Sequence, residues 1–414
     1  MWKIIYNILI HLLLPFFVFF SLASPKIRRT LGERLFPAKT KTMLSEALWI
    51  HAASVGEAVI AENLLNCVRG KDCREKFLVT TNTYYTRDFL RAKAGSNVHA
   101  YSLPFDIPFS IRRFAGGVNF KALVIVETEI WPNLIWYAGK RGIPVVIVNG
   151  RISDSTVKQY KRFSFFMRRV FSDVDLVLAQ SEGHRERYVE IGMDPSRVVN
   201  AGNMKYYRNV EGGGGASKGN IITFGSVKEK EVYIIAPVIK RLKRRFPDFL
   251  IFVAPRELHL IGLLEEQFAE SFDTMRYSVY SGLPDAKPSI VIVDTVGDLL
   301  SIYAKSAVAF VGGSLAPYGG QNMLEPLFFG TPAIFGPYTE NFREIAAKII
   351  EREAGVTVET GEELFLQMEC ILTDETMRKR MGDAGEKIVM EQKQVMERVT
   401  DAIMEVIWKN SQNS

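Results

Sequence analysis

Residues 48–69 read LWIHAASVGEAVIAENLLNCVR and contain a complete strand–turn–helix unit. Leu48–Ser54 is an almost wholly apolar run, typical of a strand that is covered on both faces of a parallel sheet. From Ala58 to Arg69 the apolar residues follow a helical spacing instead. Gly56 permits a tight turn between the two. The order strand, turn, helix predicts half of a βαβ unit, the building block of a doubly wound α/β domain.

The same alternation recurs along the rest of the chain. Further short apolar runs predict strands at Phe77–Thr81, Leu123–Glu127, Pro144–Asn149, Asp175–Gln180, Ile221–Phe224, Leu250–Ala254, Ile290–Asp294, Val308–Val311 and Ala333–Phe335. Helical patterns lie between them, for example at Leu134–Arg141 and Glu229–Arg245. We therefore expect an α/β protein with two doubly wound, Rossmann-like domains that face a cleft.

A glycine-rich stretch, residues 212–219, predicts the linker between these domains. An N-terminal domain is then expected over residues 25–211. A C-terminal domain is expected over residues 220–414 and includes a helical tail. From Glu362 onward this tail could pack on either domain.

The composition excludes several classes of protein. A hydrophobic content of 47% in 414 residues is too high for a disordered chain. Lys and Arg number 52 against 46 acidic residues, and the resulting charge of +6 favours anionic partners. Cys67, Cys73 and Cys370 form no CxxC pair, which argues against a disulfide framework or a thiolate zinc site and favours a reducing compartment.

The N-terminus predicts a membrane anchor over residues 1–24. Ile4–Ala23 is a 20-residue run without charge, and such a helix is about 30 Å long, the thickness of a bilayer core. Lys26, Arg28 and Arg29 follow at once, so the positive-inside rule places the globular part in the cytoplasm, at the inner membrane. A cleaved signal peptide and a segment that lies in the membrane plane are the competing interpretations.

Ligands of doubly wound sheets bind beyond the carboxyl ends of the strands, so polar residues at these ends are the candidate site. Glu57 lies in the first turn of the helix after Leu48–Ser54, where it can act as a general base or simply stabilise the helix dipole. Glu127–Asn133 follows another strand, and its carboxylates beside Trp131 can bind sugar hydroxyls or cap the next helix. Lys205 precedes the linker, where it can face a phosphate or be solvated.

In the second half, Arg256 follows a strand, at a position where a guanidinium can bind phosphate in a bidentate way. The segments Asp294–Asp298 and Gly312–Ser314 also follow strands. Gly319–Pro326 leads into a helix whose free amides would attract a phosphate. The sequence contains neither GxGxxG nor GxxxxGK[ST], which weakens dinucleotide and P-loop interpretations.

Metal and nucleic-acid chemistry find little support in the sequence. There is no HExxH motif, and Asp173 and Asp175, which match a DxD pattern, run directly into a strand and favour a strand-entry turn. The basic clusters Lys158–Arg169 and Lys240–Arg245 lack the interleaved aromatic residues that stack on bases. They are more typical of a solvated or lipid-facing surface, so no nucleic-acid partner is expected.

Taken together, the motifs resemble those of the 3-deoxy-D-manno-octulosonic acid (Kdo) transferases of lipopolysaccharide synthesis. The motifs that carry the resemblance are His51–Glu57, Glu127–Asn133, Asn149–Ser153, Gly202–Lys205, Pro255-Arg256 and Gly319–Pro326. The resemblance spans nearly the whole chain and implies a GT-B glycosyltransferase. The implied reaction moves Kdo from CMP-Kdo to a phosphorylated lipid A precursor of the lipid IVA type, without a metal, a cofactor or an obligate protein partner.

The resemblance also implies roles for single residues. Glu57 would be the general base, and Glu127 and Lys205 would assist the transition state. CMP would be bound by Pro255, Arg256, Val296, Gly297, Asp298, Asn322, Met323, Leu324 and Glu325. Four positions depart from the family pattern: Val296 and Asp298 replace Met and Glu, and Gln321 and Met323 replace the commoner His and Pro.

Two alternatives stay open. The chain could be a GT-B transferase or an epimerase that uses another nucleotide sugar. It could also be a membrane-anchored protein that binds a nucleotide without turnover.

Overall fold

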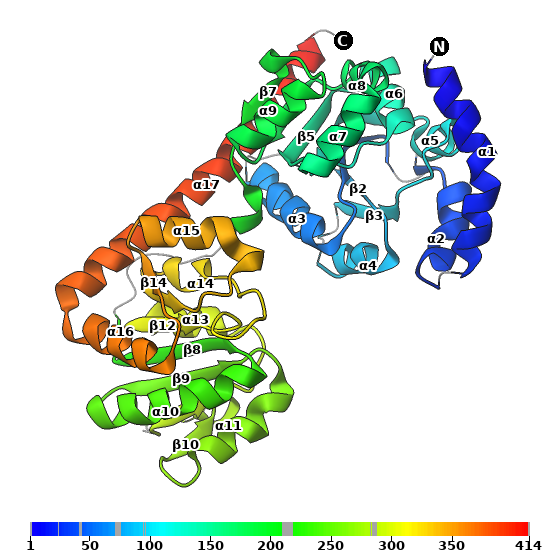
Figure 1. Cartoon of the computed structure of the whole chain (residues 1–414). Helices are drawn as coiled ribbons and strands as arrows, with labels where there is room; N and C mark the ends of the chain where they lie inside the picture. Colours follow the sequence, from blue (N-terminus) through cyan, green and yellow to red (C-terminus); the bar gives the residue numbers. More distant parts are fainter. Residues whose placement is uncertain are drawn as a thin grey trace. The chain divides into compact units, whose positions relative to one another are not determined.

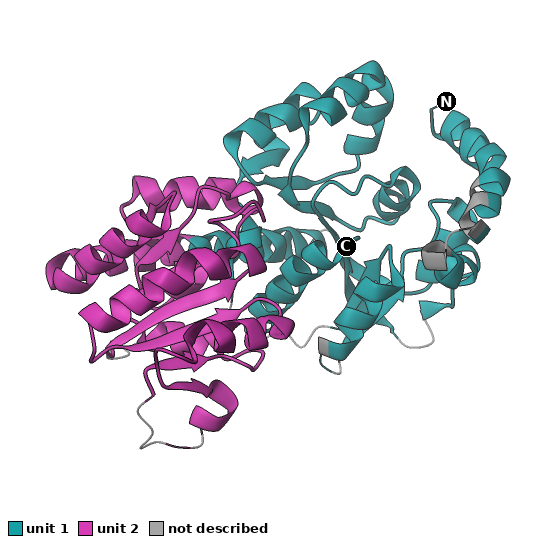
Figure 2. Cartoon of the chain, turned by 60° about the horizontal axis from the view of Figure 1, so that its bottom comes forward, with its two compact units in different colours: residues 1–208, 392–414 teal, residues 209–391 magenta. Residues whose placement is uncertain are grey.

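The computed structural model describes residues 2–23, 25–40, 44–70, 76–93, 95, 97–208, 218–281, 283 and 288–412. The chain forms two compact units, shown in separate colours in Figure 2. Unit 1 contains residues 1–208 and 392–414, and unit 2 contains residues 209–391. Each unit has its own sheet, with helices on both faces (Figure 1). Two α/β units of this kind are what the alternating pattern predicts.

The described strands of unit 1 form a parallel sheet in the order β3-β2-β1-β4-β5-β6-β7. The strands are β1 (Glu46–His51), β2 (Phe77–Thr81), β3 (Val98–Ser102), β4 (Asn119–Val126), β5 (Val145–Gly150), β6 (Leu176–Ala179) and β7 (Val198–Asn200). His51 lies opposite Thr80 of β2 on one side and opposite Ile125 of β4 on the other. Chain order reverses between β1 and β4, so these two strands mark the topological switch point.

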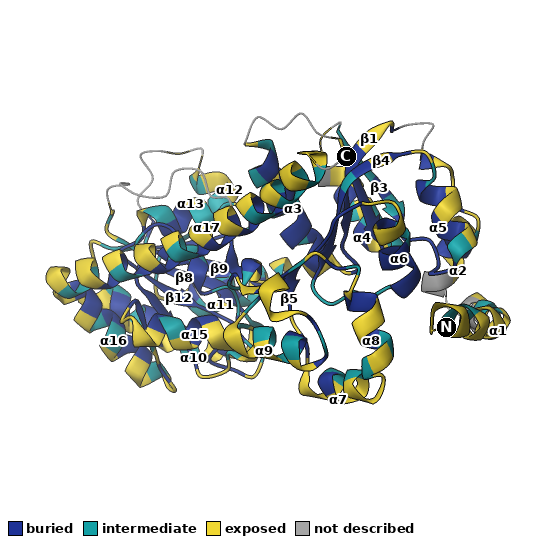
Figure 3. Ribbon diagram, turned by 90° about the horizontal axis from the view of Figure 1, so that it is seen from above, coloured by how far each residue is buried: buried dark blue, intermediate teal, exposed yellow. Residues whose placement is uncertain are grey.

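Helices cover both faces of the unit 1 sheet, and alternate strand residues divide between two cores. Trp49 and Ile125 face a core made with α5 (Pro108–Ala115), α6 (Pro132–Lys140), α8 (Ser164–Phe171) and α9 (Glu182–Glu190). Leu48 and Ile50 face the other core, made with α3 (Val55–Arg69), α4 (Tyr84–Lys93) and α17 (Glu375–Gln412). The strands are therefore buried on both sides, as Figure 3 shows, which explains their continuous apolar sequence.

Unit 2 repeats the architecture with the strand order β10-β11-β9-β8-β12-β13-β14, again parallel. Its strands are β8 (Ile221–Val227), β9 (Leu250–Pro255), β10 (Thr274–Arg276), β11 (Ile290–Ile292), β12 (Val308–Val311), β13 (Ala333–Phe335) and β14 (Gly355–Thr357). Its helices are α10 (Glu229–Arg245), α11 (Ile261–Phe268), α12 (Tyr277–Tyr280), α13 (Leu299–Lys305), α14 (Leu324–Leu327), α15 (Arg343–Glu351) and α16 (Gly361–Thr373). The order reverses between β8 and β12, which form the switch point of this unit.

Every strand predicted from the sequence is present, with ends shifted by a few residues at most. The four strands missed are β3, β7, β10 and β14, which lie at or next to the edges of their sheets. Edge strands are less covered, so their sequences lack a continuous apolar run, as in Thr274–Arg276. The predicted linker, residues 212–219, falls largely outside the described residues.

The C-terminal tail differs from the predicted domain boundary. Residues 392–414 belong to unit 1 rather than to the C-terminal domain expected over residues 220–414. The reason lies in the second half of α17, where Val395, Met396, Val399 and Ile403 pack on the face of the unit 1 sheet that also binds α3. The tail therefore completes the core of the N-terminal unit.

The N-terminal residues form two helices, α1 (Trp2–Ala23) and α2 (Pro25–Leu35). Tyr6 of α1 packs against Trp136 and Phe166, and its hydroxyl donates a 2.7 Å hydrogen bond to buried Asp106. The opposite side of α1 leaves large apolar side chains exposed. No helix among the described residues is long and apolar enough to cross a membrane, so the transmembrane span expected over Ile4–Ala23 is not supported.

Candidate active site

The candidate residues of unit 1 gather at the carboxyl ends of β1 and β4, the two strands of the switch point. His51 ends β1 and leads into α3, and Glu127 directly follows β4. Among the described residues, those other than glycine with a positive φ are Glu127, Asn149, Ser226 and Glu353. Three of these four lie at the carboxyl ends of β4, β5 and β8. Such backbone costs about 1–3 kcal/mol and concentrates at functional sites.

Glu57 lies in the first turn of α3, where it takes part in the cap of the helix. Ser54, the N-cap residue, accepts a hydrogen bond from the Glu57 amide. In return, the Glu57 carboxylate accepts from the Ala53 amide and from the Ser54 hydroxyl, both at 2.8 Å. Burial raises the pKa of the Glu57 carboxyl, although these two hydrogen bonds oppose the shift. The helix-capping and general-base roles weighed for Glu57 are therefore compatible in one carboxylate.

Glu127 lies beside Glu57 and carries the left-handed backbone, with φ of 61°. Its amide donates to the Val148 carbonyl of β5 at 2.8 Å, which holds this conformation in place. Burial raises the pKa of Glu127, and the nearby negative charge of Glu57 adds to the shift, whereas Arg151 and Lys205 oppose it. Arg151 Nε lies 3.7 Å from Glu127 Oε2. The structure thus brings Glu127 within electrostatic range of both Glu57 and Lys205.

Lys205 is placed by the turn that follows β7. It lies exposed on a short 3-10 helix, Met204–Tyr206, and its ammonium has no hydrogen-bond or ion-pair partner within the described part of the chain. The buried Asn149 side chain accepts from the Met204 amide at 2.9 Å and ties this turn to β5. Gly202 has φ of 96°, and a Cβ there would come within 2.7 Å of Val395, so glycine is required.

At the switch point of unit 2 the turn after β12, predicted as part of the ligand-binding edge, binds a side chain of the protein instead. The Gly313, Ser314 and Leu315 amides after β12 point at one buried carboxylate, that of Glu231 on α10, at 2.7–2.9 Å. The Lys228 amide donates to the same carboxylate at 3.0 Å. This amide cluster is therefore filled by the protein itself rather than left for a ligand. This contact could not be predicted from the sequence, because Glu231 looks like an ordinary residue of a first helical turn.

Other predicted donor residues lie at the neighbouring strand ends of unit 2. Pro255 ends β9, and Arg256 follows it, exposed, with its amide bonded to Val227 O at 2.8 Å. The Arg256 guanidinium has no partner among the described residues. In the loop after β11, Val296 is 86% exposed and Gly297 has φ of 107°. Asp298 accepts a 2.5 Å hydrogen bond from the Thr295 hydroxyl.

The loop before α14 offers less to an anion than the sequence predicts. The helix is only four residues long, and its first amide, that of Leu324, donates to Asn322 Oδ1 at 3.2 Å. The side chains of Met323 and Leu324 are fully buried, so these residues can reach a ligand only through their backbone. Asn322 Nδ2 lies 3.5 Å from Glu325 Oε1, and both side chains are partly exposed.

The DxD residues lie at the amino end of β6, away from the strand ends that carry the candidate site. Asp175 Oδ2 accepts from the Val145 amide at 2.8 Å, and Asp173 lies 3.5 Å from Arg169. They shape the entry into the strand, as the sequence predicts. Within the described residues there is no group of three or more His, Cys, Asp or Glu side chains arranged to hold a metal.

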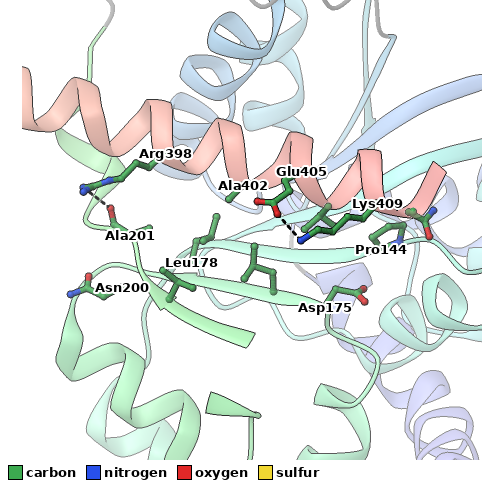
Figure 4. A pocket seen from close by; sticks show the side chains of 13 residues that line it. Pro144, Asp175, Leu178, Asn200, Ala201, Arg398, Ala402, Glu405 and Lys409 are labelled. Carbon is green, nitrogen blue, oxygen red and sulfur yellow. Dashed lines mark hydrogen bonds and ion pairs between the residues drawn. The ribbon is translucent and has the colours of Figure 1, made fainter. Parts of the chain in front are cut away.

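A cavity of about 520 Å³ lies elsewhere in unit 1, between α17 and the strands β6 and β7 (Figure 4). None of the candidate residues lines it. Its charged groups already have partners: Arg398 donates to Ala201 O at 3.3 Å, and Lys409 pairs with Glu405 at 2.6 Å (Figure 4). The candidate site is therefore the β1–β4 edge and not this cavity.

Two doubly wound parallel sheets with polar residues at their switch points define a GT-B-type fold. The chain is similar in fold to MurG from Acinetobacter baumannii, with a TM-score of 0.53, 15% identity, and coverage of 87% of this chain and 99% of that one. It is also similar to a UDP-GlcNAc 2-epimerase from Neisseria meningitidis, with a TM-score of 0.56, 11% identity, and coverage of 88% and 100%.

Sequence similarity narrows this class to one family. A 3-deoxy-D-manno-octulosonic acid transferase from Haemophilus influenzae is 31% identical over 99% of this chain and 100% of its own length. One from Aquifex aeolicus is 28% identical over 82% of this chain and 90% of its own. Residues 29–208 also match the family profile described as 3-deoxy-D-manno-octulosonic-acid transferase (kdotransferase). The chain belongs to the Kdo transferase family of glycosyltransferases, and the resemblance seen in its motifs is confirmed.

The buried Glu231 carboxylate yields a stability prediction. In Glu231→Ala the four backbone amides lose their acceptor, and each buried unsatisfied donor costs about 1–3 kcal/mol. We expect the free energy of unfolding of unit 2 to fall by at least about 3 kcal/mol in denaturant titrations. Glu229→Ala, in the same helical turn but exposed, is the control and is expected to cost less than about 1 kcal/mol. Equal costs for the two variants would contradict this role of Glu231.

Proposed function

We propose that this chain transfers Kdo from CMP-Kdo to a phosphorylated lipid A precursor of the lipid IVA type and releases CMP. The observation that carries the proposal is the grouping of Glu57, Glu127 and Lys205 at the switch point of unit 1, in a chain of the Kdo transferase family. These are the residues that the resemblance assigns to catalysis. Arg256 and the loop Val296–Asp298, at the strand ends of unit 2, are proposed to bind the CMP part of the donor.

The residues can perform each step of such a transfer. Glu57, whose pKa is raised by burial, takes the proton of the acceptor hydroxyl as its oxygen attacks the anomeric carbon. The bond from that carbon to the CMP phosphate breaks in the same step, and CMP leaves with the electron pair. Lys205 and Arg256 carry free cationic groups that can stabilise negative charge on the donor. A single displacement of this kind inverts the anomeric centre and uses protein cations rather than a metal.

The alternatives are a transferase or epimerase with another nucleotide sugar, and a nucleotide-binding protein without turnover. A transfer assay with radiolabelled donors and extracted lipid acceptor distinguishes them. We expect label from CMP-Kdo, but not from UDP-sugars, to enter the lipid, and EDTA to leave the rate unchanged. Label from a UDP-sugar alone would support the first alternative, and binding of CMP without any transfer the second.

The role of Glu57 is tested in the same assay. Glu57→Gln keeps the size of the side chain and one oxygen that can accept a hydrogen bond at the start of α3. The amide cannot act as a base as the carboxylate can. We expect the transfer rate to fall by about 10²–10⁴, the usual contribution of a general base. CMP binding is expected to be unchanged. If Glu57 only stabilises the helix, the variant loses stability of about 0.3–1 kcal/mol and turns over normally.

The role of Arg256 is tested by CMP binding in a calorimeter. Arg256→Ala is expected to weaken CMP affinity by about 1.5–3 kcal/mol, the scale of a hydrogen bond to a charged group. Arg256→Lys is expected to recover only part, because an ammonium cannot form the planar, bidentate contact. The exposed Arg244 of α10 offers a control, and Arg244→Ala is expected to bind CMP normally. Unchanged affinity in Arg256→Ala would move the donor site elsewhere.

We also propose that the protein associates with the cytoplasmic side of the inner membrane through α1, which lies on the membrane surface. The helix exposes Leu12 and Leu13, 64% and 61% exposed, whereas Tyr6 holds its other side to unit 1. Replacing both leucines by Ser is expected to reduce binding to anionic vesicles at least about tenfold, since each buried leucine contributes about 1.5–3 kcal/mol. Val279 and Leu366, exposed in unit 2, provide a control double substitution by Ser. Equal vesicle binding by both double variants would exclude α1 as the contact.

A further inference from the structure

The junction between α7 (Asp154–Arg162) and α8 exposes two aromatic side chains. Phe163 lies between the two helices and is 65% exposed. Phe165, in the first turn of α8, is 75% exposed, more than any other phenylalanine, tyrosine or tryptophan in the described part of the chain. Most of α7 is exposed as well (Figure 3). Two neighbouring rings in water forgo the free energy that burial would give, so they are candidates for contact with a partner.

Phe163 stands at a position where the fold favours a polar residue. It is the N-cap residue of α8, and its side chain accepts no hydrogen bond from the first helical turn. Serine, threonine, aspartate or asparagine would accept one and stabilise the helix. In the same unit, Ser54 and Ser181 cap α3 and α9 in this way. The ring of Phe163 thus replaces a helix cap, which favours a role in binding rather than in folding.

Basic side chains surround the two rings. Residues 158–169, which we call the α7–α8 elbow, contain no acidic residue. Phe165 precedes Arg168 and Arg169 by three and four positions of one helix, so these side chains share a face of α8. The elbow carries five basic residues, all exposed: Lys158, Lys161, Arg162, Arg168 and Arg169.

Most of these cations are not neutralised within unit 1. Lys161 pairs with Glu190, and Arg169 lies 3.5 Å from Asp173. The other three, Lys158, Arg162 and Arg168, have no hydrogen-bond or ion-pair partner within the ranges that the structure describes. A partner for the elbow must therefore offer both an apolar layer for the rings and negative charge for the cations.

The elbow is continuous with α1, the helix proposed above to lie on the membrane. The ring centroids of Tyr6 in α1 and Phe166 in α8 are 5.5 Å apart, and both rings contact Trp136 of α6. The ammonium of Lys3 lies 5.4 Å from the centre of the same Trp136 ring. Phe166 thus turns inward and joins α8 to α1, whereas Phe163 and Phe165 turn to solvent.

We propose that the α7–α8 elbow is a second membrane contact of unit 1, separate from α1, at which Phe163 and Phe165 enter the surface of an anionic phospholipid bilayer. The three unpaired cations of the elbow then contact lipid phosphates. Aromatic rings flanked by Lys and Arg match such a surface, which is anionic outside and apolar beneath. An apolar protein surface would bury the rings but leave the cations without partners.

A second contact has a consequence for the candidate site. One helix on a membrane leaves rotation about its own axis free, and a contact on a neighbouring element removes that freedom. α7 begins just beyond the carboxyl end of β5, which pairs with β4, and its nine residues span about 14 Å. The elbow therefore holds the β4–β5 edge about one short helix from the lipid headgroups. Presentation of this edge to a lipid acceptor rests on the proposed function, whereas lipid binding by the elbow does not.

The aromatic contact is tested by co-sedimentation of the full-length protein with vesicles made of equal parts of phosphatidylcholine and phosphatidylglycerol. Phe163→Ser/Phe165→Ser is expected to weaken vesicle binding at least about tenfold, because two rings no longer enter the bilayer. Serine is a favoured N-cap residue, so a denaturant titration should show no loss of stability from the change at Phe163. Tyr233→Ser/Leu366→Ser, at exposed positions of unit 2, is the control and should bind like the wild type.

The charge contact is tested with the same vesicles. Lys158→Gln/Arg162→Gln/Arg168→Gln should bind more weakly than the wild type, and its binding should depend less on the NaCl concentration. The control Arg244→Gln/Lys379→Gln/Lys387→Gln removes the same charge from exposed positions of unit 2 and should behave like the wild type. Vesicles of phosphatidylcholine alone should bind the wild type less well than the anionic vesicles.

Equal vesicle binding by Phe163→Ser/Phe165→Ser and its control would overturn the proposal, as would equal binding of the wild type to neutral and anionic vesicles. A wild-type dimer in size-exclusion chromatography that the same double change converts to a monomer, with vesicle binding unchanged, would assign the elbow to a second copy of the chain. Weak binding by the elbow variants together with normal binding by Leu12→Ser/Leu13→Ser would support the elbow and contradict the contact through α1. The assay contains neither donor nor acceptor, so its result is independent of the transfer reaction.

Discussion

The reversal of strand order between β1 and β4 brings the carboxylates Glu57, Glu127 and Glu129 of unit 1 to one edge of the sheet. Parallel strands end at one edge of the sheet, and the chains leaving β1 and β4 depart in different directions because their connections lie on different sides. His51 and Glu57 come from the first connection, Glu127 and Glu129 from the second. Residues 70 or more positions apart are thereby held at one edge by the hydrogen-bonded sheet. The carboxylates at this edge repel one another, and they stay in place because the sheet holds the backbone that carries them.

Unit 2 uses the same topology differently. Its switch point between β8 and β12 has the amides that suit an anion, but the buried carboxylate of Glu231 occupies them. This internal anion ties α10 to the loop after β12. The groups left for a ligand are therefore those at the neighbouring strand ends, where Arg256 is exposed and its guanidinium has no partner within the described part of the chain. An internal carboxylate thus fills the switch point of unit 2, whereas the switch point of unit 1 carries the candidate carboxylates Glu57 and Glu127.

Most of the strands could be predicted from the sequence, whereas the edge strands and the end of α17 could not. β2, β12 and β13 were predicted with the correct ends because strands covered on both faces are continuous apolar runs. The edge strands β7 and β14 are three residues long and carry no such run. The end of α17 belongs to unit 1 because Val399 and Ile403 pack on the sheet of that unit. The helical periodicity of the sequence shows an apolar face but does not specify which sheet it packs on.

The site shows the same division. Glu57, Glu127 and Lys205 could be found because each follows a strand end and matches a family motif. Glu231 could not, since three of its four amide partners lie more than 80 residues away and its own position looks like an ordinary first turn. The long apolar run at the N-terminus predicted a spanning helix, but the run says nothing of the contacts of Tyr6 with Trp136 and Asp106.

We propose that the carboxylates at the β1–β4 edge promote a single displacement, with Glu57 as a base and no carboxylate as a nucleophile. The configuration of the transferred sugar tests this most directly, because one displacement inverts the anomeric centre and two displacements through a glycosyl-enzyme restore it. NMR of the product formed from CMP-Kdo, compared with the donor, reads this configuration. We expect inversion. Retention would instead make one of the three carboxylates a nucleophile and exclude the single displacement.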